Sequence, residues 1–497
     1  MTNHPLCVSR NINERWVIEG DLVLQTPTHL GNGDSESIVD MPLLRDEVTG
    51  GALLPGTSLA GALRNYLRER RHGFEAPFHS HDNKLIIDQS IESLFGATKG
   101  NEEGDQSALI IDDAVSNALT IELRDGVRID PVTRTAKIDT VNGVLRGYKY
   151  DLELLEAGTT FPLHMELAIS ADDDAKQIKT LLALALDGLS RGEITLGLRK
   201  RRGFGMCNIS RWRVRQYDLR EPSALIAWLA ADRVPDIQSP SWQTGTDIAQ
   251  LLGVTLEDLS DKRSACVIQA TFKLDGSLLI RAGFGEQDRG PDTVHLHSKQ
   301  FNGQRQPVLS GTSLAGALRH RAERIVRTIR RDGQLHPIID DIFGPAEVNR
   351  GKQPAKSSRL VVRETVIDNP VHLIQNRIRI DRFTGSVHDS GLFNEQPVFG
   401  KADTYVKVHL TLRNPQEAEI GLLLLVLKDL WTGDLPLGGE VGIGRGRLEG
   451  LSISLQTSQQ NQTPLLIESI SKTNVNVSDR EVLEQYVKAL HTKVNNQ

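Results

Sequence analysis

The sequence has few cysteines and no long apolar run. Its three cysteines, Cys7, Cys207 and Cys266, are odd in number and far apart, which excludes a disulfide framework and a zinc ribbon. No apolar stretch is long enough to span a bilayer, and no apolar leader opens the chain. We therefore expect a cytoplasmic protein with reduced cysteines and no membrane contact.

The signatures of common small-molecule enzymes are also missing. The chain shows no Walker loop, dinucleotide-binding fingerprint, catalytic triad or zinc signature. It also has no excess of positive charge, since 58 basic residues face 64 acidic ones. That average taken alone favours a metabolic enzyme over a nucleic-acid-binding protein. The basic residues are nevertheless gathered at 68–72, 199–202 and 319–331, and such clusters can form a local phosphate-binding stripe.

The chain repeats itself. Residues 56–64 and 311–319 carry the same nine amino acids, GTSLAGALR. Shorter matches follow in the same order: FG at 95–96 and 343–344, RID at 128–130 and 379–381, and glycine loops at 196–205 and 437–446. Collinear matches of this kind indicate a tandem duplication.

The length of 497 residues also exceeds the roughly 250 to 300 that one core usually supports. We predict four segments: unit one (1–216), a connector with a short helix (217–262), unit two (263–456), and a polar linker followed by an amphipathic helix (457–497). Ser478 and Glu481 form a capping box for that last helix. Its apolar stripe suits docking on a partner or packing on its own domain, and the second is the commoner arrangement.

Each unit has the pattern of a strand, a helix and several further strands. Period-two alternation predicts strands at 16–25, 108–111 and 161–169 in unit one, and at 266–274, 360–363 and 405–412 in unit two. The nine-residue repeat begins a helix, with Thr57 and Ser58 as N-cap residue types. The pattern predicts an α+β fold of ferredoxin type in each unit.

The nine-residue repeat places a glycine turn at a helix N-terminus, where free N–H groups attract a phosphate. The alternative is a tight turn without a ligand, and the presence of a second copy weakens it. The predicted RNA contacts here are Gly56, Ser58, Gly61 and Arg64 in unit one, and Gly311, Ser313 and Arg319 in unit two.

The later glycine loop joins four consecutive cations to a Gly-x-Gly turn, a combination suited to a phosphodiester backbone. Unit two keeps the glycines but replaces most of the cations. The alternative is a solvated charged face. The predicted RNA contacts are Arg199, Lys200, Arg201, Arg202, Gly203, Phe204 and Gly205 in unit one, and Arg445 in unit two.

Together these motifs, with the Val39-Asp40-Met41-Pro42 segment and the Leu94-Phe95-Gly96 motif, resemble the RAMP superfamily of CRISPR-associated proteins. More narrowly, they are similar to the backbone subunit of type III effector complexes, and the duplication resembles the two-unit fusion of the III-D subtype. The resemblance covers both units. It implies two ferredoxin-like (RRM-like) modules, each with a β-hairpin thumb, that bind guide RNA (crRNA) beside other effector subunits.

The resemblance also implies a cleavage chemistry. Each thumb displaces one nucleotide of the guide–target duplex, and a loop aspartate holding Mg²⁺ or Mn²⁺ cuts the target RNA there. The loop aspartate corresponds to Asp40, which is thus both the catalytic and the metal-binding candidate. The thumbs would carry Arg128 and Arg379, with Val127 and Ile378 as the apolar tip residues.

Other residues compete for the catalytic role. In unit one, Asp34 and Asp46 have turn-like settings, and His29 lies near the same loop. In unit two, counting back from Asn302-Gly303 lands on Thr293, so the adjacent Asp292 is the catalytic and metal-binding candidate, with Asp288 behind it. His295 and His297 alternate along one predicted strand, but such a pair alone is a weak metal signature.

Three alternatives remain open. The chain is a target-cleaving backbone subunit, a guide-holding scaffold without catalysis, or an endonuclease that processes guide precursors by a metal-independent His/Tyr mechanism. A small-molecule enzyme is a more distant fourth. The first predicts two cuts in a matched target, one module apart, which require Mg²⁺ or Mn²⁺ and stop on addition of EDTA. Metal-independent cutting of repeat RNA would favour the processing enzyme.

Overall fold

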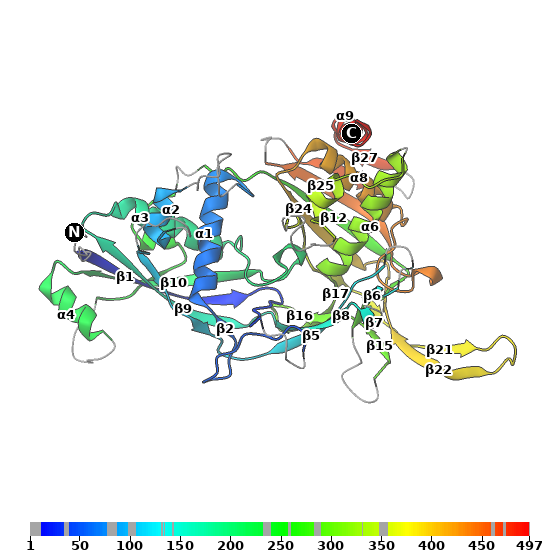
Figure 1. Ribbon diagram of the computed structural model, residues 1–497, viewed down its shortest axis with the longest axis horizontal. Coiled ribbons are helices and arrows are strands. Elements are labelled where there is room, and N and C mark those ends of the chain that lie inside the picture. The colour runs from blue at the N-terminus through cyan, green and yellow to red at the C-terminus, as the bar shows by residue number, and fades with distance from the viewer. Residues whose placement is uncertain are drawn as a thin grey trace.

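The computed structural model shows two units side by side, the first coloured blue to green and the second green to red (Figure 1). The structure describes residues 11–33, 39–76, 87–97, 106–130, 133, 135–141, 144–231, 240–256, 260–282, 290–330, 332–346, 356–458, 463–470 and 474–496. Within the described residues, no helix combines the length and the apolar character that a bilayer span requires.

Unit one has a central antiparallel sheet in the order β11-β10-β1-β9-β3. The elements follow the chain as strand, helix, strand, strand, helix, strand, with β10, β1, β9 and β3 side by side. This 4-1-3-2 order is the ferredoxin-like arrangement. The bounds are β1 (Ile12–Leu24), α1 (Gly56–His72), β3 (Leu109–Ile111), β9 (Thr160–Ser170), α3 (Ala175–Ser190) and β10 (Cys207–Asp218).

Unit two repeats the arrangement, with β25, β12, β24 and β18 side by side. The predicted α+β fold, with two tandem ferredoxin-like modules, is therefore confirmed. The bounds are β12 (Ala265–Asp275), α6 (Gly311–Ile329), β18 (Leu360–Val362), β24 (Tyr405–Arg413), α8 (Glu417–Trp431) and β25 (Arg447–Thr457).

The core of each unit lies between its sheet and its two long helices. In α1 the buried side chains are Leu59, Leu63, Tyr66 and Leu67, which recur at helical spacing. The strands bury alternate residues; in β9 these include Phe161, Leu163 and Met165. Each fully buried large apolar side chain contributes about 1.5–3 kcal/mol.

The segment predicted as a connector folds onto unit one instead. β11 (Gln243–Gly245) pairs with β10 at the sheet edge, and α5 (Ile248–Leu251) buries Ile248 in the unit-one core. The predicted short helix is α4 (Pro222–Ala230), which packs beside β10. Unit one therefore ends well beyond residue 216.

The C-terminal helix α9 (Arg480–Asn495) packs on α8, with Tyr486, Leu490 and Val494 buried. Its apolar stripe thus covers its own domain rather than a partner. The N-cap is Asp479, which accepts the Val482 N–H, and not Ser478. Two strands precede the helix and extend the unit-two sheet, β26 (Leu465–Ser469) and β27 (Val475–Val477).

The remaining elements are short; β16, β17 and β19 join the unit-two sheet beside β24, and the others lie around the sheets. They are β2 (Leu53–Leu54), α2 (Gln89–Phe95), β4 (Ala114–Val115), β6 (Ile138–Val141), β7 (Val144–Gly147), β13 (Ser277–Leu278), β14 (Arg281–Ala282), β15 (Thr293–His295), β16 (His297–Lys299), β17 (Arg305–Leu309), α7 (Ile338–Phe343), β19 (Thr365–Asp368), β20 (Val371–His372) and β23 (Val398–Phe399). The 3₁₀ turns η1 (Lys200–Arg202) and η2 (Val441–Ile443) occupy the two glycine loops.

Candidate functional site

Each unit carries a long antiparallel hairpin between its second and third core strands. In unit one β5 (Ile121–Val127) pairs with β8 (Lys149–Leu155), and in unit two β21 (Gln375–Ile380) pairs with β22 (Val387–Gln396). These hairpins lie where the thumbs were expected. The β21–β22 hairpin projects away from the body of the molecule, whereas β5 and β8 reach beneath unit two (Figure 1).

The same kind of turn follows β5 in unit one and β21 in unit two. Asp130 accepts the N–H of Thr133, and Asp381 accepts the N–H groups of Phe383 and Thr384. The unit-two turn holds Phe383 in a fully exposed position, 100% accessible. The sequence interpretation had taken Ile378 as the tip, but Ile378 pairs with Leu392 on the hairpin stem.

Val127 likewise lies on a stem, not at a tip. It is the last residue of β5 and pairs with Lys149. Arg128 follows it and stacks on Tyr148, with 5.5 Å between the guanidinium carbon and the ring centroid. In unit two the equivalent Arg379 is exposed. Both arginines therefore lie on the hairpins, below the tips.

Asp40 and Asp292 occupy equivalent places beside the returning strand of each hairpin. The Asp40 Oδ2 atom accepts the N–H of Asp151 on β8 at 2.9 Å. The Asp292 Oδ2 atom accepts the N–H of Asn394 on β22 at 2.7 Å. Both aspartates are exposed. Asp292 thus lies at the position of unit two that corresponds to Asp40 in unit one.

The neighbours of the two aspartates differ. In unit one Asp151 pairs with Asp125, so three carboxylates gather at the hairpin stem. A hydrogen bond with Asp125, desolvation, and the charges of Asp125 and Asp40 raise the pKa of Asp151. At the equivalent positions of unit two, Asn394 pairs with Asn376. Unit two therefore has one carboxylate where unit one has three.

The side chains alone do not enclose a metal ion. Among the described residues, no group of three or more histidine, cysteine or acidic side chains is arranged to hold one. Mg²⁺ often binds through one or two carboxylates and completes its shell with water and substrate phosphate. The stem of the unit-one hairpin fits that open kind of site, because Asp40 and Asp125 flank the same residue, Asp151.

The competing acids have structural roles or lie outside the described residues. Asp46 caps a turn by accepting both the N–H and the hydroxyl of Thr49, at 2.7 and 2.6 Å, and these bonds lower its pKa. Asp34 and Asp288 fall in segments that the structure does not describe. His29 is buried, with Nδ1 2.8 Å from the Glu153 carbonyl oxygen.

His295 is also structural. Its Nδ1 lies 3.2 Å from the Ile280 N–H donor, and its Nε2 lies 3.0 Å from the Val308 carbonyl oxygen, so a neutral imidazole satisfies both partners. The ring is fully buried, and this burial lowers its pKa to about 3. The His297 ring lies near His372 instead, with 5.2 Å between centroids. The alternating histidines do not form a metal pair.

This burial predicts a pH-dependent stability of unit two. In the unfolded chain His295 takes up a proton below about pH 6.5, whereas the folded chain resists protonation down to about pH 3. Stability should therefore fall as the pH drops below about 6.5, by up to ~1.4 kcal/mol per pH unit. Urea unfolding at several pH values measures the slope. His295→Gln should flatten it, and equal slopes in the two proteins would contradict the prediction.

The nine-residue repeat is used for packing rather than as an open phosphate site. In unit one the Gly56 N–H donates to Asp113 Oδ1 at 2.7 Å, and the N-cap is Pro55. In unit two the N-cap is Ser310, which accepts the Ser313 N–H at 3.2 Å. The predicted caps Thr57 and Ser58 lie after the N-cap, inside the first turn of the helix. The helix N-termini are thus occupied by protein groups.

The first glycine and the arginine of the nine-residue repeat have the same structural roles in both units. A Cβ at Gly56 would lie 2.1 Å from the Ile111 carbonyl oxygen, and one at Gly311 would lie 2.2 Å from the Arg202 carbonyl oxygen. Arg64 and Arg319 donate to the carbonyl oxygens of Gly96 and Gly344, at 3.1 and 2.5 Å. These bonds tie each long helix to the Phe-Gly turn. Three predicted contacts lie on the accessible side of their helices. Ser58 and Ser313 are exposed. A Cβ at Gly61 would have nothing within 4 Å.

The basic glycine loop lies at the junction of the two units. Arg202 donates through Nη1 to Ser358 Oγ and the Leu360 carbonyl oxygen, at 3.4 and 3.3 Å. Burial and the neighbouring Arg319 and Arg199 charges lower the pKa of Arg202 to about 10. A Cβ at Gly203 would lie 2.3 Å from the backbone nitrogen of Glu364. This end of the loop holds the units together.

Three further predicted RNA contacts are buried. Phe204 is 2% exposed and packs with Leu152 and Leu154, so it cannot stack on a base. Arg445 is 3% exposed and pairs with Glu395 and Glu440, at 3.1 and 2.8 Å. Gly205 is buried as well.

The cations that remain accessible belong to the outer part of the loop. Lys200 is exposed, Arg201 is half-buried, and Arg199 stacks on Tyr150 at 4.7 Å. Partial desolvation is the main cause that lowers the pKa of Lys200 and Arg201, and a neighbouring arginine lowers the pKa of each further.

A buried ion network joins the unit-one hairpin to unit two. Arg124 of β5 donates through Nε to Glu122 at 2.5 Å and through Nη2 to Glu364 of unit two at 2.9 Å. Ser298 of unit two donates to Glu122 at 2.9 Å. Burial alone would lower the Arg124 pKa, but the charges and hydrogen bonds of Glu364 and then Glu122 raise it. Nothing in the sequence motifs pointed to this network.

A second set of contacts links Glu69 of α1 and Glu193 of unit one to two arginines of unit two. Arg413 pairs with Glu69 at 3.0 Å and stacks on Phe74 at 4.3 Å. Arg263 pairs with Glu193 at 2.6 Å. With Arg124 and Arg202, these contacts fix the position of one unit relative to the other.

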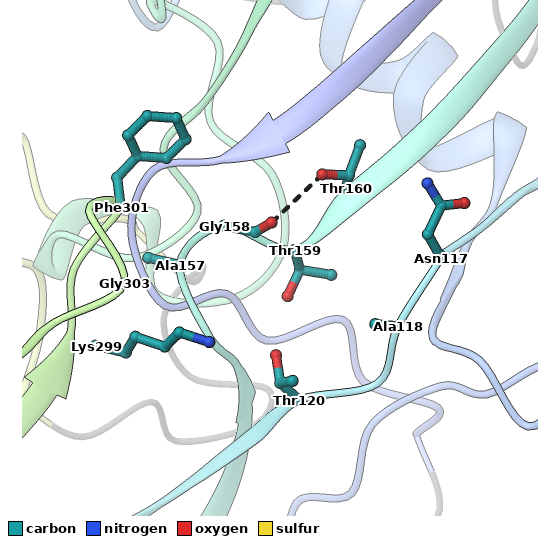
Figure 2. Close-up of a pocket in the computed structure, with 10 residues that line it drawn as sticks. All are labelled: Asn117, Ala118, Thr120, Ala157, Gly158, Thr159, Thr160, Lys299, Phe301 and Gly303. Atoms are coloured by element: carbon teal, nitrogen blue, oxygen red, sulfur yellow. Dashed lines mark hydrogen bonds between the residues drawn. The ribbon is translucent and has the colours of Figure 1, made fainter.

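A pocket of about 250 Å³ opens at the junction, between the base of the unit-one hairpin and the β16–β17 turn of unit two. Figure 2 shows Lys299 and Phe301 on one side, facing Thr120 and Thr159 on the other. The Lys299 Nζ atom already donates to Glu156 at 2.9 Å. The pocket therefore reflects incomplete packing of the two units around an ion pair.

The fold and the site together define a class of protein, a tandem of ferredoxin-like modules in which each module bears a hairpin with an aspartate beside its stem. The family model of the RAMP superfamily matches residues 21–208 and 271–449, and the chain belongs to this superfamily. The resemblance inferred from the motifs is thus confirmed. One similar protein is the "CRISPR system Cms endoribonuclease Csm3" of Streptococcus thermophilus. It is 27% identical over 197 residues, which cover 37% of this chain and 81% of the relative.

Proposed function

We propose that the chain is a backbone subunit of a type III CRISPR ribonucleoprotein, which binds crRNA along its length and cleaves complementary target RNA. The observation that carries the proposal is the equivalent placement of Asp40 and Asp292, each bonded to the returning strand of its hairpin. The Csm3 relative is named an endoribonuclease, which supports the same activity here. Partners are the crRNA, the target RNA and other effector subunits.

The chemistry follows from RNA itself, which supplies the nucleophile as its 2′-OH. Cleavage then requires a bent backbone for in-line attack, removal of the hydroxyl proton and stabilisation of the charge on phosphorus. The hairpin would distort the duplex, and Asp40 lies at its stem, where the displaced nucleotide would leave the helix. Bound Mg²⁺ or Mn²⁺ would supply a positive charge at the phosphate. Asp40, with Asp125 beside it, would hold that ion in unit one, and Asp292 would hold it in unit two.

The RNA path we propose uses the accessible cations. Arg128 and Arg379 lie on the two hairpins, and Arg199 and Lys200 lie on the outer part of the basic loop. Such contacts bind phosphate without reading sequence. This arrangement suits a subunit whose specificity comes from base pairing of the guide.

The direct test uses the chain loaded with a guide and a matched target. We expect two cuts, one module apart, in the presence of Mg²⁺ or Mn²⁺, and none after EDTA is added. The unit-one cut should be the faster, because three carboxylates gather there and only one in unit two. Gel mapping of end-labelled target gives both positions and both rates. Cutting that resists EDTA would refute the metal-dependent mechanism, and EDTA-resistant cutting of repeat RNA would favour guide processing.

The exposed tip of the unit-two hairpin gives a further prediction. Phe383 should stack on the base beside the displaced nucleotide, since an aromatic ring contributes about 1–3 kcal/mol to such stacking. Phe383→Ala should therefore slow the unit-two cut about fivefold to a hundredfold and leave the unit-one cut unchanged. Leu466→Ala, at an exposed site on β26, is the control. Equal rates for Phe383→Ala and the native chain would show that the tip does not wedge the duplex.

A second candidate function applies to unit two alone. The pair Asn376 and Asn394 replaces two of the carboxylates of unit one, which favours a module that holds RNA without cutting it. A single cut that disappears in Asp40→Asn and persists in Asp292→Asn would establish this variant.

A further inference from the structure

The strand that follows Asp292 has little backbone support of its own. β15 has three residues, and its backbone pairs with two residues of β14 and two of β22. Asp292 lies exposed just before it. Short segments with few buried contacts are the parts of a protein that open most easily. The position of the Asp292 carboxylate therefore depends on side chains that join the surrounding strands.

Glu395 lies at the centre of those strands. On β22 it pairs with Thr293, which directly follows Asp292. Its carboxylate is 1% exposed and accepts from two guanidinium groups, Arg377 Nε at 2.9 Å and Arg445 Nη2 at 3.1 Å. Arg377 belongs to β21, and Arg445 belongs to the glycine loop. One buried carboxylate thus ties both strands of the hairpin to the glycine loop, next to the strand of Asp292.

Glu440 adds the remaining strand to this network. It lies in the glycine loop and pairs with Arg445 at 2.8 Å. Arg281 of β14 lies 3.3 Å from its carboxylate, and Arg377 lies 3.8 Å away. Three guanidinium groups therefore face the carboxylates of Glu395 and Glu440. The network reaches every segment that borders β15 in the sheet.

The hairpins and the glycine loops identify the equivalent pair in unit one. Each loop aspartate accepts an N–H from the returning strand, and the next residue of that strand is Leu152 in unit one and Glu395 in unit two. Phe204 lies between two glycines of positive φ, and so does Arg445. The pair Leu152 and Phe204 thus corresponds to the pair Glu395 and Arg445.

Leu152 and Phe204 make an apolar contact with the loop of Asp40. Both side chains are 2% exposed, and Met41 packs against them. Met41 directly follows Asp40, and its backbone bridges to Leu152. Beside its loop aspartate, each unit therefore has a buried pair that joins the hairpin to the glycine loop. The pair is apolar in unit one and ionic in unit two.

We propose that Glu395 is the positioning residue of the unit-two site. Its carboxylate and the Arg445 guanidinium hold the strand of Asp292 against the hairpin, as the apolar pair holds the loop of Asp40 in unit one. The inference deepens the proposed function, and its effect on cleavage rests on that function. Positioning depends on charge in unit two and on apolar packing in unit one.

Glu395→Gln tests the proposal because it removes the charge with little change of shape. In the guide-loaded chain it should lower kcat of the unit-two cut about tenfold to a hundredfold, with KM for the target unchanged. The unit-one cut should keep its rate. Hydrogen exchange should become faster in the peptide that contains Asn394, whose N–H donates to Asp292. The peptide that contains Asp151 of unit one should exchange as before.

The double variant Glu395→Leu with Arg445→Phe places the unit-one pair in unit two. Well-packed apolar residues can replace a buried ion pair with little loss of stability. This variant should restore both the slow exchange at Asn394 and most of the unit-two cutting rate. A variant as slow as Glu395→Gln would overturn the proposal. Asp368→Asn, which breaks an accessible pair with Lys407, is the control and should change neither measurement.

The remaining outcomes separate the proposal from the proposed function. Native exchange in Glu395→Gln would overturn the proposal, and so would faster exchange with a native unit-two cut. Equal slowing of both cuts would show a general loss of structure and would also overturn it. If the native chain makes no unit-two cut, the proposed activity of unit two fails. The exchange rates at Asn394 then decide whether Glu395 holds the strand.

Discussion

Asp40→Asn should slow one of the two cuts in a matched target by about 100-fold to 10,000-fold, an effect of the same order as the loss of an acid–base group. Asparagine keeps an oxygen that can accept the Asp151 N–H, which Asp40 now accepts at 2.9 Å. The loop should therefore keep its position while its charge is lost. Guide and target binding should be nearly unchanged, the pattern of a residue that acts only in the transition state.

The matched control is Asp292→Asn in unit two, where Asn394 donates in the same way. It should remove the second cut and leave the first. Asp46→Asn, at a carboxylate that only caps a turn, should leave both cuts. If Asp40→Asn cleaves at the native rate, Asp40 serves the structure alone and is not the catalytic residue of unit one.

The largest stability effect should come from Arg124. Arg124→Met leaves Glu122 and Glu364 buried without their cation, at 4% and 5% side-chain exposure. Breaking a buried ion pair in this way costs about 3–5 kcal/mol. The loss should appear as a lower unfolding midpoint in urea and as faster proteolysis at the junction, because Arg124 joins the two units.

The control for this prediction is the triple variant Arg124→Met, Glu122→Gln and Glu364→Gln. It removes all three charges together, so no charge stays buried without a partner, and most of the lost stability should return. Arg45→Met, which breaks an accessible pair with Glu153, should change the midpoint by less than about 1 kcal/mol. Equal effects of Arg124→Met and Arg45→Met would show that the junction network contributes little.

The fold was accessible from the sequence because alternation and repetition are local signals. The strands starting at Ile12 and Ala265 lie where period-two alternation placed them. Asp292 was reached by counting from a repeated turn, and it lies where Asp40 lies in unit one. Counting landed on Thr293, next to Asp292, because the loops between strand and helix have similar lengths in the two units.

The errors concern residues whose environment depends on the other unit. Arg202 belongs to a run of four cations, and such runs are usually solvated. Only the docking of unit two shows that its guanidinium donates to the Leu360 carbonyl oxygen. The wrong prediction of the tip residue of the unit-two hairpin has a different cause. Asp381 and Thr384 have the spacing of an Asx turn, which was the available signal that Phe383, not Ile378, lies at the end.

The network around Arg124 has a consequence for synthesis of the chain. The ion pair of Arg124 cannot form until Glu364, which is 240 residues later in the sequence, has been synthesised. At translation rates of about 5–20 residues per second, the ribosome needs about 12–48 seconds to reach it. During that time Glu122 and Arg124 of the nascent first unit lack Glu364, and the surface of β5 that unit two later covers is exposed. Slow translation between the two units would prolong this exposure. A chaperone that covers the emerging hairpin would lower the risk of aggregation.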